Sequence, residues 1–270
     1  MNVKLVLALS LFAAYSVADA ALIVQSGETI AFLGDSITYY GNSRPLGYIH
    51  LVMKGLESVG VKATAIPAGV GGQKSDQLLE RLDRDVLSRN PQWMTLSCGV
   101  NDVYHAHIPG RKGVSIADYR RNVTEILDRC DAAGVKVLLM TPTMITEDLE
   151  NEQNVELENY CAWLRQVAAE RKLPLADLNV VMRAEVVRRR TCEHDARNKL
   201  TWDGIHMTAE GDEMIASCLL AAMGVDREKE ATIRRAWDAY RQGIIDNSNG
   251  RAVCAGDDGK DAGGSSKSFE

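Results

Sequence analysis

Short apolar runs alternate along this chain with longer amphipathic stretches, and this alternation limits the possible fold more than any other feature. The apolar runs cover residues 29–33, 61–66, 93–98, 135–140 and 173–177, and each has the length of a buried strand. Helical spacing of apolar residues is found over 46–59, 75–87, 116–133, 155–171, 178–190, 209–223 and 228–245. Strands alternating with helices predict an α/β protein, a three-layer α/β/α sandwich whose central parallel sheet has about five strands.

The N-terminus is typical of an export signal. Lys4 precedes an uncharged run over residues 5–17, and the small-x-small sequence Ala18-Asp19-Ala20 follows. We therefore expect a signal peptide over residues 1–20, cleaved after Ala20, and a secreted or periplasmic protein. The apolar run is too short to span a bilayer, so we expect no stable membrane insertion after its removal.

The remainder of the chain is expected to form one domain, over residues 21–245. Residues 246–270 are mostly Gly, Ser, Asp and Lys with few large apolar side chains, which predicts a disordered tail. The formal net charge is −6, which argues against a nucleic-acid partner. Export would make the six cysteines possible disulfide partners, in pairings that the sequence does not decide.

Glycine and polar residues follow the predicted strands, at the edge where open α/β sheets bind ligands. Ser36 stands two residues after the first strand's exit at Gly34, and Gly72 and Asn101 follow the next two strands. The N–H groups of Ser36 and Gly72 and the side-chain amide of Asn101 are suitable donors for an oxyanion.

A base for Ser36 is found far downstream. A serine attacks a carbonyl only when a base takes its proton, and His206 is the natural candidate. Asp203, three residues earlier, is placed to bind the other nitrogen of the imidazole ring. These residues together supply the parts of an acyl-transfer site.

Four sequence blocks, in this order, resemble the SGNH hydrolases, also called the GDSL family. They are Gly34-Asp-Ser-Ile, Gly-Gly72, Gly99-Val-Asn101-Asp and Asp203-x-x-His206. The resemblance implies a flavodoxin-like fold and ester hydrolysis by a serine, with neither metal nor cofactor. It implies the nucleophile Ser36, a triad completed by Asp203 and His206, and an oxyanion hole of Ser36, Gly72 and Asn101.

Other residues near these blocks are also candidates for a functional role. Asp35 and His105 are candidates for contact with the substrate. Pro67 stands where many family members have Asn, which bears only on the local backbone. His105 and His107 with Asp102 form an alternative metal site, although the family chemistry needs no metal.

The partner that we expect is a small-molecule or polysaccharide ester. No long apolar insertion provides the lid of a membrane-active lipase, and aromatic residues near the blocks (Tyr39, Tyr40, Tyr104 and Trp202) are suited to stacking on a sugar. The chain is in this respect similar to the family's carbohydrate acetylesterases. The alternatives are a lysophospholipase or thioesterase acting on lipid acyl groups, and a non-catalytic carbohydrate-binding domain on the same fold.

Overall fold

The computed structural model describes residues 22–192 and 199–255, with side chains to residue 247. The predicted signal peptide and the tail from residue 256 therefore lie outside the described residues. Within the described ranges, no helix is both long and apolar enough to cross a membrane.

A five-stranded parallel sheet forms the centre of the molecule, in the order β2-β1-β3-β4-β5. The strands are β1 (Thr29–Gly34), β2 (Thr64–Gly69), β3 (Trp93–Ser97), β4 (Lys136–Met140) and β5 (Leu175–Ala176). All residues of β3 and all but the first of β1 are buried, because helices cover both faces of the sheet. The three-layer α/β/α arrangement predicted from the sequence is confirmed.

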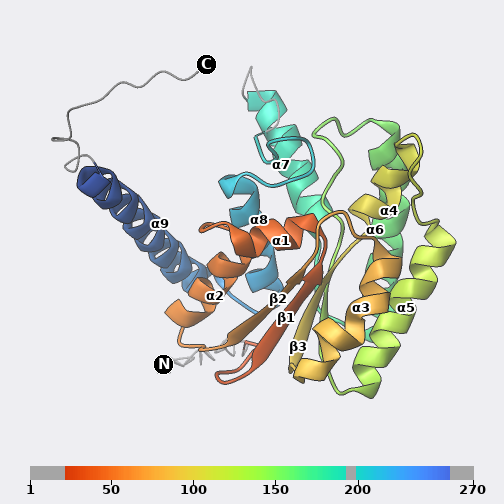
Figure 1. The fold of residues 1–270 in the computed structure, drawn as a ribbon, viewed down its shortest axis with the longest axis horizontal. Coiled ribbons are helices and arrows are strands. Elements are labelled where there is room, and N and C mark those ends of the chain that lie inside the picture. Colours follow the sequence, from red (N-terminus) through yellow and green to blue (C-terminus); the bar gives the residue numbers. More distant parts are fainter. Residues whose placement is uncertain (1–21, 193–198, 256–270) are drawn as a thin grey trace, which may run out of the picture.

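The helices form two outer layers (Figure 1). One layer contains α3 (Ser75–Asp85), α4 (Val100–Tyr104), α5 (Ile116–Ala132) and α6 (Glu152–Arg171), and the other contains α1 (Ser36–Ser43), α2 (Tyr48–Ser58), α7 (Leu178–Cys192), α8 (Ala209–Ala222) and α9 (Arg227–Ala255). Trp237 anchors α9 to the second layer: it is 2% exposed and donates a hydrogen bond from Nε1 to Leu51 O at 2.7 Å.

The structure differs from the prediction where local signals are ambiguous. Ser36 begins α1, a helix that the sequence did not predict, because the Asp35 carboxylate caps that helix at the N–H of Ile37. The predicted end of the last helix at residue 245 is wrong, since α9 continues to Ala255. Residues 246–255, the first part of the predicted tail, thus belong to α9, and the disorder expected of the tail stays a prediction.

The second strand also begins later than predicted and contains Pro67. Thr64 N donates to Glu28 O, directly before β1, and the alternation along the strand turns the nitrogen of Pro67 to the open side. Because β2 is the edge of the sheet, a proline at this place removes no hydrogen bond from the ladder.

The cysteines that the structure describes are free thiols: Cys98, Cys130, Cys161, Cys192 and Cys218. Cys98 follows β3 and is buried, as its apolar surroundings in the sequence predict. The side chain of Cys254 lies outside the described part, so the expectation of disulfides gains no support from the five others.

Candidate active site

The structure brings Ser36, His206 and Asp203 into one hydrogen-bonded series, although Ser36 is distant from the other two in the sequence. His206 Nε2 lies 2.8 Å from Ser36 Oγ, and His206 Nδ1 lies 2.6 Å from Asp203 Oδ2. The carboxylate accepts a hydrogen bond from Nδ1–H, which leaves Nε2 as the acceptor of the hydrogen bond from the serine hydroxyl. His206 is therefore in the tautomer that a general base for Ser36 requires.

Two elements position this series. Ser36 begins α1 directly after β1, where Gly34 is needed because a Cβ there would collide with Thr38. Asp203 and His206 lie on a short loop, closed by an antiparallel bridge between Thr201 and Met207. We call residues 201–207 the catalytic loop. Within it Asp203 Oδ1 accepts the backbone N–H of His206 at 2.8 Å, which fixes the carboxylate against the imidazole.

Asn101 joins the loops that follow the first three strands. It lies in the first turn of α4, after β3, and is 4% exposed. Its Nδ2 lies 3.0 Å from Gln73 O in the loop after β2 and 3.3 Å from Asp35 Oδ2 after β1. The amide nitrogen thus lies between the loop that carries Ser36 and the loop after β2, residues 70–74.

The loop after β2, residues 70–74, passes beside Ser36. A Cβ at Gly71 would stand 4.0 Å from Ser36 Cβ, and one at Gly72 would stand 4.0 Å from His105 Cε1. Gly72 has a φ of 73°, a backbone conformation that residues other than glycine rarely adopt. The structure therefore places the predicted oxyanion donors Ser36, Gly72 and Asn101 on adjoining loops.

Arg81, on α3, joins the loops that follow β1 and β2, and the sequence did not indicate this role. It is 3% exposed, and its Nη2 donates to Gly34 O at 2.8 Å while Nε donates to the side chain of Gln73. Asp85 pairs with its Nη1 at 2.9 Å. The available signal was an arginine three residues after Leu78, on the apolar face of the predicted helix 75–87.

Aromatic side chains border His206. The Trp202 ring stacks on the imidazole at 5.3 Å between centroids, and Tyr40 meets it edge-on at 5.1 Å. Arg44 lies over both Tyr40 and Trp202 and donates from Nη1 to Met207 O at 2.8 Å. Trp202 and Tyr39 are each 51% exposed, so an open aromatic surface adjoins the triad.

The electrostatics favour a charged Asp203 and a neutral His105. Partial burial acts to raise the pKa of Asp203, but hydrogen bonds from the backbone and ring of His206 and from the N–H of Ile205 outweigh it and lower that pKa. Burial, with the charges of Arg111 and Lys74, lowers the pKa of His105. His105 Nε2 therefore accepts a hydrogen bond from Arg111 Nη1, at 3.2 Å.

Asp35 does not occupy the substrate surface, contrary to the expectation. It is 1% exposed, and its oxygens accept from Ile37 N at 2.9 Å and from Asn101 Nδ2. Burial, with a further contribution from Asp102, raises the pKa of Asp35 to about 7 despite the hydrogen bond from Ile37. Asp35 lies in the protein interior, where it binds the start of α1 and Asn101.

The three residues of the alternative metal site bind different partners. Asp102 accepts from Ser75 N at 3.1 Å, and His107 lies 2.8 Å from Glu156. His105 bonds to Arg111. Within the described residues, no group of three or more His, Cys, Asp or Glu side chains is arranged to hold a metal ion.

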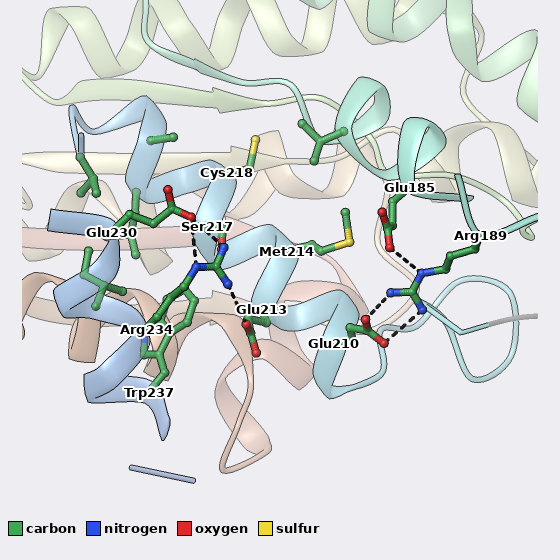
Figure 2. A pocket seen from close by; sticks show the side chains of 15 residues that line it. Glu185, Arg189, Glu210, Glu213, Met214, Ser217, Cys218, Glu230, Arg234 and Trp237 are labelled. Atoms are coloured by element: carbon green, nitrogen blue, oxygen red, sulfur yellow. Dashed lines mark hydrogen bonds and ion pairs between the residues drawn. The ribbon is translucent and has the colours of Figure 1, made fainter. Parts of the chain in front are cut away.

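A cavity of about 500 Å³ lies between α7, α8 and α9, away from these residues (Figure 2). Its charged side chains already pair with one another: Arg189 with Glu185 and Glu210, and Arg234 with Glu213 and Glu230. None of the triad or oxyanion candidates lines it.

A serine hydrogen-bonded to a histidine that a carboxylate orients is the arrangement used for acyl transfer. This arrangement places the protein among the serine hydrolases. Comparison with known proteins narrows this class. Residues 32–214 match the GDSL-like Lipase/Acylhydrolase family. The chain therefore belongs to that family, and it is a serine esterase.

Individual relatives agree with this assignment. The acetylxylan esterase of Geobacillus stearothermophilus is 26% identical over 220 residues, which cover 75% of this chain and 97% of that protein. The acetyl xylan esterase AlAXEase, whose crystal structure is known, is 32% identical with a TM-score of 0.65, over 72% of this chain and 98% of that one. The crystal structure of the Geobacillus stearothermophilus acetylxylan esterase Axe2 has a TM-score of 0.67 at 23% identity, over 76% of this chain and 98% of that one, and shows the same fold.

The raised pKa of Asp35 predicts a pH-dependent stability. An unfolded Asp has a pKa of about 3.9. Between pH about 4 and about 7, the Asp35 carboxyl therefore keeps its proton in the folded protein but has lost it in the unfolded chain. This contribution to stability is present below pH about 4 and is lost as the pH rises to about 7. In urea titrations, the free energy of unfolding of Asp35→Asn relative to wild type should rise across that window. A difference independent of pH would contradict the assignment.

Proposed function

We propose that this protein removes acetyl groups from an acetylated carbohydrate through an acetyl-enzyme on Ser36. The single observation that carries the proposal is the series Ser36–His206–Asp203, set beside the exposed ring of Trp202. The named activity of the relatives, acetylxylan esterase, supports it. So do the known catalytic mutants of Axe2, in which a serine, an aspartate or a histidine is replaced by alanine.

The first half-reaction forms the acetyl-enzyme. Ser36 Oγ attacks the acetyl carbonyl carbon while His206 Nε2 takes the hydroxyl proton, and Asp203 stabilises the imidazolium that results. The N–H groups of Ser36 and Gly72 and the amide of Asn101 bind the oxyanion. The tetrahedral intermediate then releases the sugar oxygen, which receives the proton from His206.

The second half-reaction returns the free enzyme. Water attacks the acetyl carbonyl as His206 Nε2 takes one of its protons. The bond to Ser36 Oγ breaks, Oγ regains a proton from His206, and acetate leaves. No step of this cycle draws on a metal or a cofactor.

The shape of the site favours a bulky alcohol. His206 is only partly buried, with 20% of its side chain exposed, and Trp202 stands beside it at the surface. A sugar ring that contacts the exposed part of Trp202 would have its ester groups near Ser36. His105, beside Gly72, is proposed to contact the same substrate on the oxyanion side.

Replacement of Ser36 tests the nucleophile. We expect Ser36→Ala to lower kcat for p-nitrophenyl acetate by several orders of magnitude, as loss of a triad member does, and Asp203→Asn to lower it by roughly 10⁴-fold. Steady-state hydrolysis, with folding checked by circular dichroism, measures both. Equal rates for Ser36→Ala and wild type would remove Ser36 from the mechanism. Glycan binding by both proteins without hydrolysis would favour the carbohydrate-binding alternative.

Replacement of Trp202 tests the carbohydrate. We expect Trp202→Ala to raise KM for acetylated xylo-oligosaccharides by a few-fold to about tenfold, the effect of losing an aromatic contact, with a smaller change in KM for p-nitrophenyl acetate. Trp202→Phe, which keeps a ring, is the matched control. Faster cleavage of long-chain acyl esters or thioesters than of acetyl esters would instead support the lipid acylhydrolase alternative.

We further propose that the protein is exported and that the mature chain begins at Ala21. The support is the charged start, the apolar run and the small residues Ala18 and Ala20. Mass spectrometry of the full-length gene product from a secreting bacterial host should find Ala21 at the N-terminus, outside the cytoplasm. Intact Met1 in that fraction, or retention in the cytoplasm, would refute the proposal.

A further inference from the structure

A buried carboxylate holds the chain where it enters the catalytic loop. Glu147 is 3% exposed and lies between β4 and α6, more than fifty residues before its partners. Its Oε1 accepts the backbone N–H groups of Leu200 at 2.9 Å and Thr201 at 2.8 Å, and Oε2 accepts that of Lys199 at 3.1 Å. The hydroxyl of Thr201 also donates to Oε1, at 2.9 Å.

The segment that carries Glu147 is itself fixed to the start of α6. Asn154 Oδ1 accepts the N–H of Ile145 at 2.9 Å, and its Nδ2 donates to Ile145 O at 2.8 Å and to Asp148 O at 2.7 Å. Asn151 donates to the same two carbonyl oxygens, at 2.9 and 2.7 Å. Glu147 therefore projects from an anchored turn rather than from a mobile loop.

A second contact joins this turn to the catalytic loop itself. Thr146 N donates to Gly204 O at 2.7 Å, and Gly204 lies between Asp203 and His206. Thr146 has a φ of 59°, which is unusual for a β-branched residue and costs energy. The turn keeps this conformation with Thr146 against Gly204 and Glu147 against residues 199–201.

We propose that Glu147 is a positioning residue for the catalytic loop, holding Asp203 and His206 at the distance from Ser36 that proton transfer requires. The inference rests on the triad roles proposed above. Asp203 is two residues beyond Thr201, the last group that Glu147 binds, so a shift of that backbone is carried directly into the triad.

The carboxylate suits this purpose better than a neutral side chain would. Its partners, three backbone N–H groups and the Thr201 hydroxyl, all donate hydrogen bonds here. A carboxylate offers only acceptors and so suits all four. An amide in its place would turn an NH₂ group toward backbone N–H groups and leave buried donors unpaired. Because catalysis is sensitive to small displacements of aligned groups, the cost appears in kcat.

Glu147→Gln is the principal test, with p-nitrophenyl acetate as substrate. We expect kcat to fall roughly tenfold to a hundredfold, the loss caused by a displacement of about 1 Å, while KM stays within about twofold. The downfield proton resonance of His206 Nδ1–H, bonded to Asp203, should weaken or broaden in the same variant. A merely structural role would lower the melting temperature and leave both readouts unchanged in the folded fraction.

Two further variants keep the test decisive. Thr201→Val keeps the shape and removes one donor to Glu147, so it should lower kcat a few-fold at unchanged KM even if Glu147→Gln does not fold. Asp212→Asn is the matched control: this carboxylate is also buried, but it binds Tyr48 N at 3.1 Å on α2, and it should leave kcat unchanged.

The outcomes separate this inference from the proposed function. Loss of activity in Ser36→Ala together with wild-type kcat and an intact resonance in folded Glu147→Gln and Thr201→Val would overturn the inference alone. Activity retained in Ser36→Ala would overturn the proposed function instead. An equal fall of kcat in Asp212→Asn and Glu147→Gln would also overturn the inference, because any buried carboxylate would then serve.

Discussion

Hydrogen bonding of β1 to strands on both of its sides is the constraint on which the site depends. In register, Gly34 of β1 lies opposite Gly69 of β2 and Ser97 of β3, so three strands end at one level. The chain leaves β1 toward β2 through the helix layer of α2 and returns to β3 through that of α3, on the other face (Figure 1). The loops after β1 and β3 thus diverge at a topological switch point, and Ser36 and Asn101 stand on its two sides.

Buried charges then fix what the sheet has brought together. Arg81 binds the carbonyl oxygen of Gly34 and the side chain of Gln73, Asp35 binds the start of α1 and Asn101, and Glu147 binds the approach to the catalytic loop. In each case a charged or titratable side chain forms hydrogen bonds with backbone groups in the protein interior. These hydrogen bonds also hold the proposed catalytic groups in place, which is the preorganisation that electrostatic catalysis requires.

The sequence indicated those parts of the candidate site whose residue types are constrained by chemistry. Ser36, Asn101, Asp203 and His206 were accessible because each carries a distinctive side chain, and because parallel strands deliver their following residues to one edge. The role of Glu147 could not be predicted, since most of its partners are backbone N–H groups of residues 199–201. The sequence does not show which backbone groups a side chain will bind. Asp35 was misjudged for a related reason: its role as an N-cap depends on Ser36 starting a helix, which Gly-Asp-Ser does not reveal.

The proline in β2 bears on how the protein meets other chains. An uncovered edge strand presents a row of backbone donors and acceptors on which the sheet of another molecule can continue. Pro67 directs its ring nitrogen to that open side, where it has no proton to offer, so the row is interrupted in the middle of a short strand. The edge is thereby a poor template for edge-to-edge growth of the sheet into aggregates, at no cost to the ladder with β1 that aligns Ser36.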